Sequence, residues 1–192
     1  HMFFTANKRD TSEDDFLDRV DRLGIVYNGE THEENVQYYF TLPKQNLEKG
    51  LDFMAVAITS PLFKQTELNN QIAVVNGEFD RNEANPYFSF TRAVSQKLWG
   101  DLWNRKEPLG VRPAINAATR EKMLAIQKKY YIPNNSLLII AGDVNTNEIK
   151  KLAPKYFSDW KPGPDPFKNN PSPVIPALEK TTYVTDFVNQ PT

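Results

Sequence analysis

The acidic and amide side chains of residues 66–83 are spaced so that they could take part in metal or acid–base chemistry. Glu67, Gln71 and Glu78 fall on one stripe of a predicted helix. A carboxylate at the edge of a buried face loses part of its hydration, so it gains from a nearby cation or hydrogen-bond donor. Glu78 is therefore a candidate metal ligand, although the same pattern also fits a solvated flank of ordinary surface acids. The apolar residues beside this stripe share helical spacing and predict the buried face: Leu68, Ile72, Val75 and Phe79.

Histidine is the other side chain in this sequence that could bind a transition metal. The 192 residues contain two histidines, His1 and His32, and no cysteine, so a metal here would need histidine and carboxylate ligands. A catalytic zinc ion needs three protein ligands and one open position for water. His32 lies in a polar stretch beside Glu33 and Glu34, which is typical of a surface histidine with solvated acidic neighbours.

The elements that must position these side chains begin with a helix predicted over residues 12–23. Ser12 is a natural N-cap, three acids follow it in the first turn, and a glycine then ends the apolar periodicity. A hairpin is predicted next, with strands over 25–27 and 36–42. Asn28 and Gly29 form a turn-like dipeptide between these strands.

The remaining elements follow from the same periodic patterns. The Gly- and Pro-rich stretch 100–118 predicts a surface loop, and the apolar run 136–141 predicts a short buried strand. A hairpin, stacked helices and a strand–helix unit together indicate the α+β class. Further helices are predicted over residues 46–60, 66–83, 119–131 and 145–157, with another that begins at Pro86.

Composition excludes two classes of partner. The chain is 40% hydrophobic and 24% charged with a formal net charge of −1, which argues against a nucleic-acid-binding protein with its usual basic surplus. Apolar runs such as 137–141 are far too short to cross a bilayer, so we expect no membrane-spanning segment. The absence of cysteine fits a bacterial periplasm or a cytoplasm equally well.

Four segments in order resemble the pitrilysin/insulinase family of zinc metallopeptidases, whose signature is the inverted motif His-x-x-Glu-His. The first is similar to the family's Gly-x-x-x-Asn-Ala-x-Thr strand, and the second to the helix that supplies the last zinc ligand. The third is similar to a Tyr-x-Pro-Asn-Asn turn before an apolar strand that ends in Gly-Asp. The fourth is similar to the junction between the family's two homologous halves. The segments are 23–31 with the aromatic residues 38–40, then 67–78, 129–144 and 156–160.

The resemblance assigns metal-site roles to three residues. In this family the zinc ligands are the two histidines of the motif and a later glutamate, and the motif's glutamate is the general base. Glu78 matches the later glutamate, and it lies 77 positions after His1, a gap usual for the family. His1 is a ligand only if it is native, because His-Met is also what cloning leaves after an affinity tag is removed. Gln71 replaces the family's second glutamate and is an auxiliary residue that cannot carry a proton.

The function implied by the resemblance is hydrolysis of peptide bonds by metal-activated water in a zinc-dependent peptidase. The first histidine of the motif and the general base are not in this sequence, so we expect this chain alone to be inactive, with weak or absent zinc binding. Gln71 favours an alternative, a non-catalytic homologue of the same fold that binds peptides or serves as the structural half of a heteromeric peptidase.

The implied fold is an α+β metallohydrolase domain of the processing-peptidase kind, with a mixed sheet packed against helices. We expect residues 1–160 to form part of this domain, without its opening strands and motif helix. Residues 161–180, rich in proline, are predicted to be a linker, and residues 181–192 to be the first strand of a second homologous domain.

The resemblance also implies a surface for the substrate. A peptide is expected to add as a strand to the sheet edge formed by Asn28, Gly29, Glu30 and Thr31, mostly through backbone groups. The Asn-Gly pair fits a plain hairpin turn equally well. Because the opening strands are not in the chain, the exposed sheet edge is also expected to support self-association.

Overall fold

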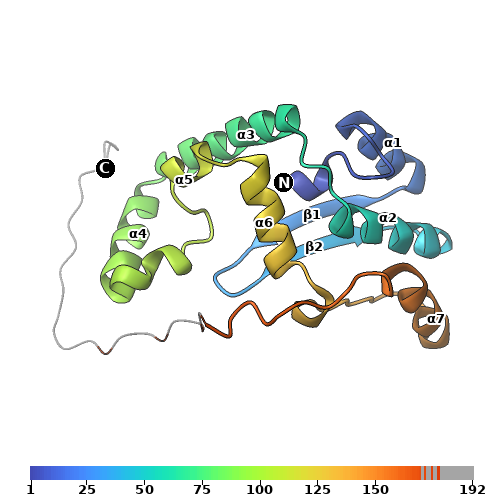
Figure 1. The fold of residues 1–192 in the computed structure, drawn as a ribbon. Helices are drawn as coiled ribbons and strands as arrows, with labels where there is room; N and C mark the ends of the chain where they lie inside the picture. The colour runs from blue at the N-terminus through green and yellow to red at the C-terminus, as the bar shows by residue number, and fades with distance from the viewer. Residues whose placement is uncertain (170, 172–173, 175–176, 178–192) are drawn as a thin grey trace. The chain divides into compact units, whose positions relative to one another are not determined.

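A computed structural model describes residues 1–169, 171, 174 and 177 of the chain (Figure 1). The described residues fall into two compact units. Unit 1 contains His1–Glu30, Gln37–Gln71 and 119–169, and unit 2 contains Thr31–Val36 and Ile72–Ala118. The linker predicted over 161–180 is therefore only partly described, and the strand predicted within 181–192 lies outside the described residues.

Helix α1 spans Glu13–Leu23 and confirms the helix predicted from its capping signals. The Ser12 hydroxyl accepts a hydrogen bond from the backbone N–H of Asp15 at 3.1 Å, so one of the unpaired amides of the first turn is satisfied. Gly24 ends the helix with φ of 62°, a left-handed conformation that glycine adopts without a steric penalty.

The sheet of the described residues has two strands, β1 (Val26–Thr31) and β2 (Val36–Thr41). They are joined by a turn over residues 32–35, where the His32 N–H donates to the Asn35 carbonyl at 2.8 Å. The hairpin is therefore present as predicted, but its first strand runs further along the chain than expected.

The turn predicted at Asn28 and Gly29 is wrong, because both residues lie inside β1. The φ angle of Gly29 is not positive, so its backbone does not adopt the left-handed conformation that favours glycine in turns. A Cβ atom at Gly29 would lie 3.1 Å from Cε2 of Phe4 and 3.4 Å from Cδ1 of Tyr38. Close packing of aromatic rings against the strand therefore accounts for this glycine, and turn geometry does not.

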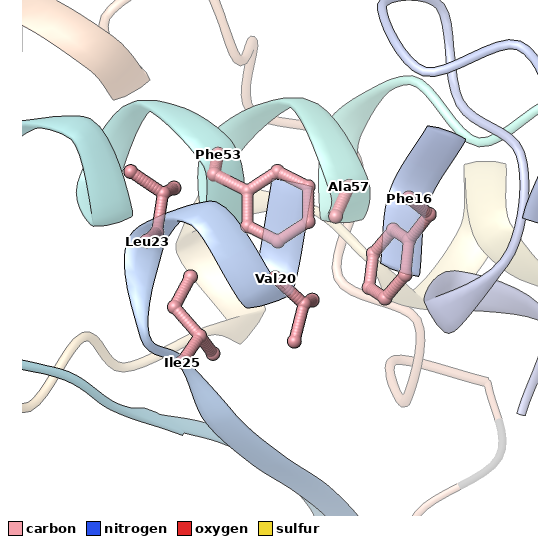
Figure 2. Packing of buried hydrophobic residues seen from close by; sticks show 6 residues of the cluster. All are labelled: Phe16, Val20, Leu23, Ile25, Phe53 and Ala57. Carbon is pink, nitrogen blue, oxygen red and sulfur yellow. The ribbon is translucent and has the colours of Figure 1, made fainter. Parts of the chain in front are cut away.

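The core of unit 1 lies between α1, the hairpin and helix α2 (Leu47–Thr59), as Figure 2 shows. The Phe16 and Phe53 rings are fully buried with centroids 4.9 Å apart, and Phe53 also stacks on Phe40 of β2 at 5.5 Å. Burial of each such side chain contributes roughly 1.5–3 kcal/mol. The clustered residues are Phe16, Val20, Leu23, Ile25, Phe53 and Ala57.

The later helices of unit 1 confirm the periodic patterns of the sequence. Helix α6 spans Arg120–Tyr130, and α7 spans Thr146–Phe157 and packs beside α2 (Figure 1). Lys155 of α7 reinforces that packing, because its Nζ lies 2.6 Å from Oε1 of Glu48 on α2. Two short 3-10 turns, η2 and η4, cover Lys44–Asn46 and Pro133–Asn135.

The prediction of a buried strand over 136–141 is wrong. The structure assigns no strand there, and Leu137 and Ile139 are 83% and 75% exposed. An apolar run becomes a buried strand only when a neighbouring strand takes up its backbone hydrogen bonds. Within the described residues the hairpin is the whole sheet, and it does not pair with this run.

Helix α3 (Gln65–Glu83) begins in unit 1 and continues into unit 2, where α4 (Pro86–Trp99) follows it. Both helices confirm the predictions. The loop predicted over 100–118 is instead partly helical, with η3 (Gly100–Arg105) and α5 (Arg112–Asn116).

Cation–aromatic packing orders this stretch of unit 2. The Arg92 guanidinium carbon lies 4.9 Å from the centroid of the buried Trp103 ring, and Lys106 Nζ lies 5.0 Å from that of Trp99. These contacts join residues several turns apart in the sequence. The loop prediction used only the local glycine and proline content, so it could not take them into account.

The described part of the chain is thus rich in helix with a small sheet, as expected for the α+β class. None of its helices has the length and apolar character needed to span a bilayer.

Candidate metal and peptide-binding site

The segment that carries His1 is built into the core of unit 1. Met2 and Phe3 are buried in a 3-10 turn, η1 (Met2–Phe4). The Phe4 N–H donates to the His1 carbonyl at 3.0 Å, and the Thr5 hydroxyl donates to the Met2 carbonyl at 2.9 Å. The His1 backbone is therefore held in place by the packing and hydrogen bonds of the residues that follow it.

A polar network fixes the far end of this segment. The Asn7 side-chain oxygen accepts from the backbone N–H groups of Arg9 and Asp10, both at 2.9 Å. The buried Asp10 carboxylate pairs with Arg19 of α1 at 2.7 Å. Arg9 makes two parallel bonds to Asp52 of α2, at 2.6 and 2.8 Å. The loop before α1 is thereby attached to both helices of the core.

The structure brings His1 and Gln71 together across 70 positions of sequence. Nδ1 of His1 and Oε1 of Gln71 lie 3.1 Å apart, within hydrogen-bonding distance. One turn earlier on α3, Glu67 is buried, and its Oε2 accepts a hydrogen bond from the Ala6 N–H at 3.3 Å. Two successive turns of α3 thus contact the segment that begins at His1.

Glu78 lies two turns after Gln71 on α3 and belongs to unit 2. Its side chain is 30% exposed, with Oε1 4.0 Å from Nη2 of Arg81. Within the described ranges, no group of three or more His, Cys, Asp and Glu side chains could hold a metal ion. Imidazole nitrogen and carboxylate oxygen are suitable donors for zinc, but the described residues do not by themselves fit a complete catalytic site.

The predicted peptide-binding residues lie together on β1. Asn28, Glu30 and Thr31 are exposed, and Gly29 is half-buried against the aromatic core. The Asn28 side-chain oxygen accepts from the Gly29 N–H at 2.8 Å, and Tyr39 of β2 donates to Glu30 Oε1 at 3.1 Å. In the described residues β1 pairs with β2 on one side and with no strand on the other.

A pair of tyrosines beside the His1 segment escaped the sequence analysis. The Tyr38 and Tyr131 hydroxyls lie 2.7 Å apart, and the Phe3 ring contacts both rings at centroid distances of 5.3 and 4.5 Å. Burial raises the pKa of both phenols above the ordinary value for tyrosine. The two residues are 93 positions apart, and no local pattern could have paired them.

The hairpin turn bears out one expectation and corrects another. His32 is exposed, as predicted for a surface histidine. Glu34 was expected to be only solvated, but it forms an ion pair with Lys106, whose side chain is 4% exposed. A buried ammonium group needs a counter-charge, which a reading of local polarity could not reveal.

The chain is similar in sequence to proteins named as zinc proteases. The chain is 25% identical to an uncharacterized zinc protease of Rickettsia felis over 100% of its length and 48% of that protein. It is 27% identical to the zinc protease PqqE of Helicobacter pylori, over 89% of this chain and 40% of that protein. Human insulin-degrading enzyme is 24% identical over 92% of this chain and 18% of the enzyme. The chain therefore spans about half the length of these relatives, or less.

Solved structures show the same fold. A protease from Helicobacter pylori matches with a TM-score of 0.69 at 24% identity, over 92% of this chain and 41% of that one. The periplasmic protease PqqL from Escherichia coli matches with a TM-score of 0.75 at 21% identity, over 93% and 20%. The predicted α+β metallopeptidase fold is confirmed.

Family matches complete the assignment. Residues 1–109, more than half of the chain, match insulinase (peptidase family M16), and this range includes His1, Gln71 and Glu78. Residues 117–191 match the peptidase M16 inactive domain. The class is that of the zinc metallopeptidases, and zinc is the family's cofactor. This chain belongs to the insulinase family, peptidase family M16.

Proposed function

We propose that this chain is part of a zinc-dependent peptidase in which His1 and Glu78 are two of the three protein ligands of zinc. The observation that carries the proposal is the 3.1 Å contact between His1 Nδ1 and Gln71 Oε1. It sets His1 against the helix on which Glu78 follows seven positions later. In this proposal the third ligand and the general base come from residues outside the 192.

Zinc in such a site lowers the pKa of a bound water and polarises the scissile carbonyl group. Gln71 would assist through hydrogen bonds alone, because its amide cannot exchange a proton in the way a carboxyl group does. The 192-residue chain is expected to be inactive, since the described residues contain no group of three candidate ligands.

The test compares the 192-residue chain with the whole protein from which it comes. The chain is expected to hold well below one zinc per molecule by elemental analysis and to leave casein uncleaved, and stoichiometric zinc with turnover would refute this. In the whole protein Glu78→Gln should abolish both zinc retention and cleavage. Glu83→Gln, on the same helix, is the matched control and should retain them.

We further propose that Asn28, Gly29, Glu30 and Thr31 of β1 bind the peptide substrate as an added strand. The proposal is supported by the exposure of three of these residues and by the side of β1 that has no strand partner in the described residues. Peptides N-methylated at alternate backbone amides should bind at least about tenfold more weakly, because each lost hydrogen bond leaves an unpaired group. Equal tolerance of N-methylation at every position would contradict an added strand.

The alternative function is that of a non-catalytic homologue, a peptide-binding or structural half of a heteromeric peptidase. Two observations favour it: Gln71 stands where the family usually has an acid, and residues 117–191 match a domain described as inactive. A whole protein that binds peptides but retains no zinc and cleaves none would establish the alternative.

Two protein partners are proposed. One is a second homologous half-domain, because the relatives are about twice as long as this chain or longer. The other is a second copy of this chain, held through the exposed sheet edge and through exposed apolar side chains such as Leu137 and Ile139. Light scattering should show oligomers that Ile139→Lys disrupts and Leu17→Lys, on α1, does not. A monomer at all concentrations would contradict self-association.

A further inference from the structure

We propose that Glu67 is a positioning residue, whose buried carboxylate fixes the segment bearing His1 against helix α3. This inference rests on the proposed role of His1 as a zinc ligand. It concerns a side chain that the metal-site assignment does not use, one turn before Gln71 on the same stripe of the helix.

Glu67 occupies an unusual environment for an acid. It is 7% exposed, and Phe63 and Leu68, which are close to it in sequence, are buried apolar residues. Within the described part of the chain it has no ion pair, and its one hydrogen bond comes from the Ala6 N–H at 3.3 Å. Burial of an acid without a cation costs folding free energy. Such a residue is therefore expected where its hydrogen bond has a structural or functional role that offsets this cost.

The group that Glu67 holds is the backbone amide of Ala6, which has no other hydrogen-bond acceptor among the described residues. Ala6 is fully buried, and its carbonyl accepts from the Leu62 N–H at 3.0 Å. The carboxylate therefore completes the hydrogen bonding of Ala6. Without it, the buried N–H of Ala6 would lose this acceptor, and the segment would lose its hydrogen bond to α3 at that residue.

The two contacts from α3 act on opposite ends of residues 1–6. Glu67 holds Ala6 and Gln71 holds His1, and positions i and i+4 lie on one face of a helix. A two-point attachment sets both the distance and the orientation of the His1 ring relative to the helix. Metal ligands need placement to within about 0.5 Å, and the Glu67 contact adds a restraint on the backbone to the Gln71 contact at the His1 ring.

The inference is tested on the 192-residue chain by NMR, without zinc, so that it can fail independently of the peptidase proposal. The chain has two histidines, and His32→Gln assigns their ring signals. Glu67→Ala should accelerate amide exchange at Ala6 by at least about tenfold and shift the His1 ring signals, with α1 amides unchanged. Glu67→Gln retains an acceptor and should preserve both readouts, as should Asn70→Ala, an exposed control on the same helix.

Three outcomes would overturn the inference. The first is a Glu67→Ala variant with unchanged Ala6 exchange and unchanged His1 signals. The second is a uniform loss of protection across unit 1, which would show that Glu67 acts only on general stability. The third is a Glu67→Gln variant that behaves like Glu67→Ala. If the NMR result holds but the whole protein keeps no zinc, the positioning inference stands and the peptidase proposal fails.

Discussion

Replacement of Arg19 by methionine should destabilise the chain. Among the described residues, Arg19 is the only ion-pair partner of the buried Asp10 carboxylate. The Asp10 side chain is 3% exposed, and Arg19, at 2.7 Å, is 32% exposed. Breaking a buried pair by removing one partner costs about 3–5 kcal/mol. Because a third of the arginine side chain faces solvent, which screens the pair, we expect about 2–3 kcal/mol. That is a large part of the roughly 5–15 kcal/mol that stabilises a typical domain.

Urea denaturation followed by circular dichroism measures this effect. With a slope of about 1–3 kcal/mol per molar urea, the midpoint should fall by about 0.7–3 M. Arg22→Met, an exposed arginine on the same helix whose side chain bonds to the Asp18 carbonyl, is the matched control and should change the free energy by under about 0.5 kcal/mol. Equal effects of the two variants would refute the assignment of Asp10 as a buried, charge-dependent anchor of the His1 segment.

Three further predictions concern other parts of the molecule. Phe16→Ala, in the fully buried core, should cost about 3–5 kcal/mol in the same denaturation assay, and a loss under about 1.5 kcal/mol would contradict the packing. Hydrogen bonding to Lys155 lowers the pKa of Glu48 from its ordinary 4.5. The ionised Glu48 therefore stabilises the folded state above pH 4.5, and this contribution is lost as the pH falls through the folded-state pKa. Glu48→Gln should therefore flatten the acid limb of a stability–pH profile, and an unchanged limb would exclude the linkage. Glu34→Ala leaves the Lys106 ammonium buried without its partner and should cost about 1–2 kcal/mol, measured as a shift in urea midpoint that is absent in Glu33→Ala.

The elements that the sequence predicted correctly are those whose signals are local. Helix α1 followed from its serine cap, acidic first turn and terminal glycine, all of which act within one turn of the helix ends. The stripe on α3 followed from helical periodicity, and the structure buries Leu68 and Phe79 on the adjoining face.

The predictions that failed depend on contacts between distant residues. The run 136–141 is apolar enough for a strand, but a strand exists only if another chain segment accepts its hydrogen bonds. Gly29 suggested a turn because glycine tolerates turn geometry, whereas the structure uses its small size beside Phe4. For the candidate site, spacing and resemblance predicted His1, Gln71 and Glu78. The role of Glu67 toward Ala6 requires knowledge of how residues 1–10 fold back onto α3.

The burial of Met2, Phe3 and Thr5 has a consequence for mutational scanning of this protein. Substitutions at these three positions would remove core volume or a hydrogen bond, so each would reduce the folded fraction whether or not it touched the chemistry of His1. A scan scored by a functional readout alone would therefore mark the whole stretch as essential, although these side chains act through folding. The abundance of each variant must be measured together with its function, and a shortened version of the protein that begins after Phe3 would lose part of its interior.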